Sequence, residues 1–152
     1  MLVDWHWGLV AGLNVLGVPL IHLGVSWLFQ QMPRHWFEKP CRFRQKAFFE
    51  KVFRVRSWRD HLPDAAPWVG GEAKATLQQT PRAELPKFAA ECLRGIYAHW
   101  AQFFLLLVFM IWTPAPWAWI FFFYSMLLNL PCIVNLSYTR ARLAPVLALL
   151  RQ

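Results

Sequence analysis

Three long apolar segments alternate with basic segments along the chain, and this alternation predicts three membrane-spanning helices. The first covers about residues 7–29, reads WGLVAGLNVLGVPLIHLGVSWLF and carries no charge. At ~1.5 Å per residue, such a helix crosses a hydrocarbon core about 30 Å thick. Asp4 precedes it and no Lys or Arg does, so we expect a retained helix and not a signal peptide. The other two cover about residues 95–112 and 117–138.

The sequence TPAP, residues 113–116, separates the second and third apolar segments. Two prolines so close together cannot continue a helix, because each one removes a backbone donor. We therefore expect a tight turn here and a helical hairpin made of the last two spans.

The distribution of charge orients these spans. None of the 16 Lys and Arg residues precedes Arg34; all of them lie either between Arg34 and Arg94 or in the tail from Arg140 onward. Loops on the cytoplasmic side of a membrane carry an excess of Lys and Arg. The pattern predicts that the N-terminus is outside and the C-terminus inside.

A long basic loop, residues 30–94, is therefore expected in the cytoplasm. Within it KAFFEKVFRVRSW, residues 46–58, alternates aromatic with basic residues, which predicts an interfacial amphipathic helix. The part rich in Pro, Gly and Ala, residues 62–86, predicts an irregular segment. The tail, residues 140–152, is too short to span and is expected to lie along the interface.

The composition supports a single all-α integral membrane domain over residues 1–152. Hydrophobic residues make up 57%, the mean hydropathy is +0.30, and there are 10 Trp and 13 Phe. The net charge of +8 flanks the spans and forms no groove, which argues against nucleic-acid binding. The three Cys have no metal-site or disulfide spacing, so we expect no metal and reduced thiols.

Polar residues inside the predicted spans are candidate site residues, because polar groups are costly in lipid. They are Asn14 and His22 in the first span, His99 and Gln102 in the second, and Asn129 and Asn135 in the third. His22 and His99 lie at similar depths, roughly 8–13 Å from the same interface at ~1.5 Å per residue. One cavity open to the cytoplasm could hold both histidines.

Two further features surround these residues. On the second span Glu91, Arg94, His99 and Gln102 share one polar face, about 140° wide at ~100° per residue. Pro131 is expected to kink the third span and to expose backbone groups beside Asn129 and Cys132.

Four segments carry a resemblance to a known family: LIHLGVSWLFQQMP (20–33), FEKVFRVRSWRDHLPDAA (49–66), ECLRGIYAHW (91–100) and NLPCIVNLSYTRARL (129–143). The chain resembles the glycosyl-4,4'-diaponeurosporenoate acyltransferases, small bacterial membrane enzymes of carotenoid synthesis. The matching positions are His22, Trp58, Asp60, Leu62, Pro63, Glu91, Arg94, His99, Asn129, Pro131, Cys132, Tyr138, Arg140 and Arg142. The chain departs from the family at GIYA, residues 95–98, and at Ser137 and Thr139.

The resemblance implies O-acyl transfer from a fatty acyl thioester, either acyl-CoA or an acyl carrier. The acceptor would be a hydroxyl of a glycolipid or a glycosylated isoprenoid. It implies no tightly bound cofactor, and it places the protein among the lipids of the bacterial cell (inner) membrane with its site facing the cytoplasm.

This reaction needs a base for the hydroxyl proton and donors for the oxyanion. We predict His99 as the base, oriented by Asp60 or Glu91, with His22 as the second candidate. Asn129 and amides near Pro131 are predicted to stabilise the oxyanion.

Substrate binding is predicted at a second group of residues. Arg94, Arg140 and Arg142 are expected to contact the phosphates of the donor, since guanidinium groups bind phosphate in a bidentate manner. Trp58, Cys132 and Tyr138 complete the substrate-binding positions that the resemblance implies.

Three alternatives remain open at this stage. The protein could be a non-catalytic membrane subunit whose polar residues only tie helices together. Cys132 could carry the acyl group as a nucleophile. Finally, three helices enclose little volume, so a homo-oligomer with a shared site is an alternative to a monomer.

Overall fold

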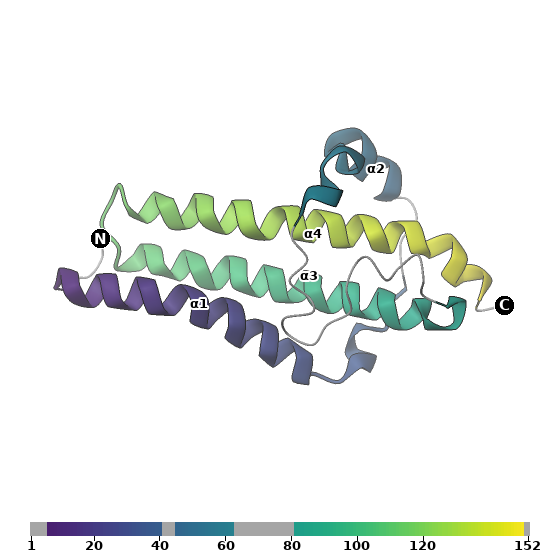
Figure 1. Ribbon diagram of the computed structural model, residues 1–152, viewed down its shortest axis with the longest axis horizontal. Coiled ribbons are helices and arrows are strands. Elements are labelled where there is room, and N and C mark those ends of the chain that lie inside the picture. The colour runs from purple at the N-terminus through teal and green to yellow at the C-terminus, as the bar shows by residue number, and fades with distance from the viewer. Residues whose placement is uncertain (1–5, 41–44, 63–80, 151–152) are drawn as a thin grey trace.

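The computed structural model describes residues 6–40, 45–62 and 81–150, and these form an all-helical bundle without a strand. Three long helices lie side by side: α1 (Trp7–Gln31), α3 (Leu85–Leu107) and α4 (Ala118–Leu149), with α3 packed against both of the others (Figure 1). Short 3₁₀ turns flank them: η1 (Arg34–Phe37), η6 (Arg82–Glu84) and η7 (Val108–Ile111). All three long helices are long and apolar enough to cross a membrane, which confirms the predicted fold class.

The bundle has two chemically different ends. Helix α1 ends, α3 begins and α4 ends at one of them, which we call the basic end (Figure 1). The opposite end holds the turn between η7 and α4 and is called the turn end. At the turn end, Asn14 of α1 donates from Nδ2 to the Thr113 hydroxyl at 3.1 Å and accepts from the Trp112 indole at 3.0 Å. Asn14 thus joins α1 to the turn between the other two helices.

The long helices extend further at the basic end than the sequence predicted. Helix α3 starts at Leu85, ahead of the predicted limit at residue 95. Helix α4 continues through Pro131 and Pro145 to Leu149, so the predicted separate tail is part of the same helix. The reason is packing: Leu143 and Leu147 of α4 are buried in a cluster with Phe88 of α3.

The predicted amphipathic helix is shorter than expected. Helix α2 (Gln45–Val52) is followed by the 3₁₀ turns η2 (Val55–Ser57) and η3 (Arg59–His61). The chain leaves the helix at Arg54, whose φ of 47° is left-handed and cannot continue an α-helix. Helix α2 packs on α4, where Phe49 and Val55 are buried against Tyr138. Phe48 stays exposed, so apolar surface remains for contact with lipid.

Several predicted features lie outside the described residues. They are Cys41, Pro63, most of the segment 62–86 and the last two residues of the tail.

The close approach of α1 to η7 depends on Gly17. A Cβ added there would lie 2.6 Å from a ring carbon of Phe109, which is itself buried. We expect Gly17→Ala to lower the free energy of unfolding by about 1–3 kcal/mol, because the ring must move within a packed contact. Gly24→Ala is the matched control, since nothing lies within 4 Å of a Cβ on Gly24 of the same helix. Unfolding in mixed micelles measures both, and equal stability of the two variants would contradict the prediction.

Candidate active site

A chain of hydrogen bonds between α3 and α4 holds His99 in the interior of the bundle. His99 Nδ1 lies 3.0 Å from Oδ1 of Asn129, whose side chain is fully buried. Asn129 Nδ2 donates to the Ser125 carbonyl at 3.1 Å, one helical turn earlier on α4. Ser125 Oγ in turn donates to the Phe103 carbonyl of α3 at 3.0 Å.

The direction of these bonds fixes the tautomer of His99. The Ser125 carbonyl can only accept, so the amide NH₂ of Asn129 faces it and the amide oxygen faces the imidazole. An oxygen acceptor requires Nδ1 of His99 to carry the proton. In the neutral ring the lone pair is then on Nε2, which is the atom that can take up a proton.

Both ends of the Asn129 amide are therefore engaged, and its role differs from the predicted one. It orients the imidazole and is not placed as an oxyanion donor. Pro131 does not supply donors either, because α4 is continuous there. The group that a proline leaves without a partner in a helix is a carbonyl, which would repel an oxyanion.

His22 occupies a separate polar contact between α1, α3 and α4. Its Nε2 lies 3.4 Å from the Tyr124 hydroxyl. Gln102 donates to the His22 carbonyl at 3.2 Å and to the Ser26 hydroxyl at 3.0 Å. His22 and His99 thus meet α4 through different residues, and Gln102 joins α1 to α3.

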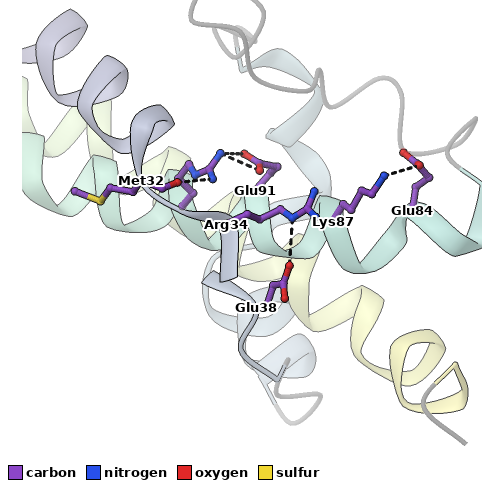
Figure 2. A network of polar contacts seen from close by, with 7 residues as sticks. Met32, Arg34, Glu38, Glu84, Lys87 and Glu91 are labelled. Atoms are coloured by element: carbon purple, nitrogen blue, oxygen red, sulfur yellow. Dashed lines mark hydrogen bonds and ion pairs between the residues drawn. The ribbon is translucent and has the colours of Figure 1, made fainter. Parts of the chain in front are cut away.

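Arg94 lies at the basic end, buried between α1 and α3. Its Nη1 contacts both carboxylate oxygens of Glu91, at 2.9 and 2.8 Å, and Gln30 Oε1 at 3.1 Å. Its Nη2 donates to the Met32 carbonyl at 3.1 Å, and its guanidinium lies 5.1 Å from the centre of the Phe37 ring. Figure 2 shows the Glu91 carboxylate and Met32 converging at this point, with the exposed ion pairs Arg34–Glu38 and Lys87–Glu84 nearby.

Arg140 is buried as well. It donates to the Ala89 carbonyl of α3 at 3.2 Å and to the Lys39 carbonyl at 2.9 Å. These contacts join α4 to α3 and to the segment after η1. The guanidinium groups of Arg94 and Arg140 are therefore engaged inside the protein.

A third group of residues surrounds Tyr138 of α4, whose ring is almost fully buried. The Tyr138 hydroxyl donates to Glu50 Oε1 at 2.8 Å and accepts from Arg56 Nε at 3.3 Å, and Arg56 pairs with Glu50 at 3.0 Å. The guanidinium groups of Arg59 and Arg142 lie 6.0 and 5.7 Å from the centre of the ring. We call Arg56, Arg59 and Arg142 the arginine cluster.

The contact between Glu50 and Tyr138 makes the attachment of α2 depend on pH. The hydrogen bond from the Tyr138 hydroxyl, with the charge of Arg56, holds the pKa of Glu50 below its ordinary value of 4.5. A lowered pKa means that the contact stabilises the fold fully above pH 4.5 and is lost as the pH falls through the folded-state pKa. Glu50→Gln should therefore be less stable than the parent at about pH 7, and the difference should shrink at about pH 3. Denaturant unfolding at both pH values measures this, and a difference independent of pH would contradict it.

Most of the chain is similar to one known protein family. A family model described as glycosyl-4,4'-diaponeurosporenoate acyltransferase matches residues 33–149, which is most of the chain. The chain belongs to this family. The glycosyl-4,4'-diaponeurosporenoate acyltransferases are enzymes of carotenoid synthesis that transfer an acyl group, so the protein is an acyltransferase with a glycosylated isoprenoid acceptor. The comparisons with curated proteins and with solved structures each find no match.

The acyltransferase match includes α2, α3 and α4 but not α1. Of the two candidate bases, His99 lies within the matched residues and His22 lies outside them. The contact between α3 and α4 therefore lies within the matched residues.

The structure brings some predicted site residues together and separates others. His99 meets Asn129, and Glu91 meets Arg94. The predicted partner Asp60 is exposed and pairs with Arg59 at 3.1 Å, so the oriented nitrogen of His99 faces Asn129 instead. Cys132 follows on α4, one turn beyond Asn129, and is half-buried.

Trp58 packs beside the buried cluster of Phe49, Val55 and Tyr138, and its indole donates to the Phe53 carbonyl at 2.7 Å. This contact helps to hold η2 and η3 against α4.

Sequence reasoning missed several residues of these groups, among them Glu50, Arg56, Arg59 and Ser125. The first three lie in or directly after the alternating aromatic and charged stretch 46–58, and Ser125 is four residues from Asn129. The described residues contain no cluster of His, Cys, Asp or Glu that could hold a metal ion.

Proposed function

We propose that the protein transfers a fatty acyl group from a thioester to a sugar hydroxyl of the acceptor, with His99 as the general base. The acceptor class is that of the family, a glycosyl-4,4'-diaponeurosporenoate. The observation that carries the proposal is the hydrogen bond from His99 Nδ1 to Asn129, which leaves Nε2 as the basic atom of the neutral ring.

The position of His99 suits an acceptor that sits in the membrane. On α3 it lies five residues beyond Arg94, about 7.5 Å further into the bundle at ~1.5 Å per residue. An acceptor with its isoprenoid chain in lipid and its sugar near the headgroups would present a hydroxyl at about this depth. The basic end then faces the cytoplasm of a bacterial cell, where Lys and Arg accumulate and acyl thioesters are made.

The reaction balances with one base. Nε2 of His99 takes the proton of the acceptor hydroxyl as the oxygen attacks the thioester carbonyl. The tetrahedral intermediate collapses by breaking the C–S bond, which forms the ester. The imidazolium then returns the proton to the departing thiolate, so His99 is regenerated and a free thiol is the second product.

Mass spectrometry of lipid extracts tests the proposal. Cells that make the acceptor are compared with and without the protein, and the expected product is heavier than the acceptor by one acyl group. If folded protein is present in the membrane and no acylated glycolipid forms, the proposal is wrong. The His99–Asn129 bond would then only tie α3 to α4.

A further inference from the structure

The arginine cluster has the chemistry of an anion site, and it differs from the two buried arginines, Arg94 and Arg140. Arg94 and Arg140 direct their terminal Nη1 and Nη2 groups to acceptors inside the protein. By contrast, the side chain of Arg56 is 69% exposed and Arg142 is exposed. The charge needed to hold a soluble anion is therefore around Tyr138.

The cluster is ordered by contacts with the folded core. The Tyr138 ring is 1% exposed and gives Arg59 and Arg142 an aromatic surface, while its hydroxyl contacts Arg56. A guanidinium group lying against a ring uses its face, which leaves the N–H groups at its edge for a phosphate. Side chains held in this way lose less freedom when an anion binds.

The net charge of the cluster favours an anion. Three guanidinium groups face two carboxylates, those of Glu50 and Asp60, so positive charge is in excess. Lys46 of α2 also acts electrostatically on Glu50. The two carboxylates therefore offset only part of the positive charge, and the cluster still attracts a phosphate.

The spacing between Tyr138 and Asn129 along α4 matches the length of one kind of phosphate-bearing group. Tyr138 and Asn129 are nine residues apart on the continuous helix α4, about 14 Å at ~1.5 Å per residue. A 4′-phosphopantetheine arm has roughly thirteen bonds from phosphorus to sulfur, about 15 Å at the rise per bond of an extended polypeptide. A phosphate at the cluster would thus allow the thioester at the other end of the arm to reach His99.

We propose that Arg56, Arg59 and Arg142 bind the phosphate of a 4′-phosphopantetheine arm, the group that acyl-CoA and acyl carrier protein share. This inference rests on the proposed function, since it assigns a binding site to the donor of that reaction. The observations that carry it are the arrangement of the three arginines around Tyr138 and the spacing along α4 between Tyr138 and Asn129, the hydrogen-bond partner of His99.

Two donors that differ only in this phosphate provide the test. The protein in lipid nanodiscs is assayed with acyl-phosphopantetheine and with acyl-pantetheine carrying the same fatty acyl chain. We expect the protein to prefer the phosphorylated donor in kcat/KM on the order of ten- to a hundredfold, the value of one or two charge-assisted hydrogen bonds. Arg142→Gln and Arg56→Gln should each reduce this preference by raising the KM for the phosphorylated donor.

The phosphate-free donor controls for folding. Each variant should lose less rate with acyl-pantetheine than with the phosphorylated donor, so that a general loss of folded protein or of His99 chemistry is divided out of the preference. Arg34→Gln removes the same charge at the basic end, where Arg34 pairs with Glu38, and should leave the preference unchanged.

Three results would overturn the inference. The variants could keep the full preference, or lose rate equally with both donors. They could also lose binding to vesicles containing anionic lipid while keeping the preference, which would assign the cluster to headgroups. No transfer by the parent from any thioester, or full activity of His99→Ala, would instead overturn the proposed function and the inference with it.

Assays with two further donors, acyl-CoA and acyl carrier protein, show which of them supplies the phosphopantetheine arm. The lower KM of acyl-CoA or of acyl carrier protein identifies the natural donor, and either outcome supports the phosphate site. Loss of the preference at high ionic strength is expected in both cases, because the cluster is near the surface.

Discussion

His99→Ala should lower the rate of acyl transfer by about 10²–10⁴-fold, the usual contribution of a positioned general base. The alanine removes Nε2, the proposed proton acceptor, and leaves the Asn129 oxygen without its donor. The measurement is the rate of acceptor acylation in membranes with matched amounts of folded protein. His35→Ala is the control, since His35 is an exposed histidine in η1.

A substitution at Asn129 adds a second comparison to the same experiment. Asn129→Ala removes the acceptor that fixes the Nδ1 tautomer of His99, so we expect a smaller loss of rate and a changed pH profile. The double variant should be no slower than His99→Ala alone, because both residues act through Nε2. If His99→Ala stays active and His22→Ala does not, the base has been assigned to the wrong histidine.

Arg94→Met should be the most destabilising of these substitutions, with a loss of about 3–5 kcal/mol in the free energy of unfolding. Arg94 is 8% exposed, and its guanidinium donates to Glu91, Gln30 and the Met32 carbonyl at the same time. Methionine fills the space but removes the ion pair to Glu91, whose side chain is only 22% exposed. Arg94→Lys should recover only part of the loss, because one ammonium cannot reproduce these bonds.

Helix α3 supplies the matched control. Lys87 pairs with Glu84 at 2.9 Å, also three residues apart, but both side chains are more than 40% exposed. Lys87→Met should therefore cost at most about 0.5 kcal/mol. Thermal unfolding in mixed micelles compares the two, and similar losses for Arg94→Met and Lys87→Met would show that burial is not what makes the Arg94 contact strong.

The three spans could be predicted because each helix is decided by local sequence. The uncharged segment from Trp7 and the prolines after Thr113 specify the first span and the hairpin turn without help from distant residues. The limits at the basic end could not be predicted in the same way. The last turns of α4 persist past Pro145 because Leu147 packs on α3, and such a contact is not visible in the sequence.

The site shows the same division. His99 and Asn129 stand out because polar residues are rare in apolar spans, but their pairing depends on which faces of α3 and α4 meet. The predicted partner Asp60 follows Trp58 in a recognisable motif, and the fold places it at the surface beside Arg59. Arg94 and Arg140 have the charge of phosphate-binding residues, but only the structure reveals the acceptors that already occupy them.

The length of α4 has a consequence for how the enzyme meets different membranes. Its 32 residues extend about 48 Å, well beyond a hydrocarbon core of about 30 Å. Asn129, which contacts His99, and Tyr138, at the centre of the arginine cluster, both lie on this one helix, so the separation of these two residues is set by helix geometry. A thicker or thinner bilayer can tilt α4 or shift the acceptor along it, but it cannot change the separation of Asn129 from Tyr138. Variation in membrane thickness therefore acts on the acceptor, while the span available to the donor arm stays constant.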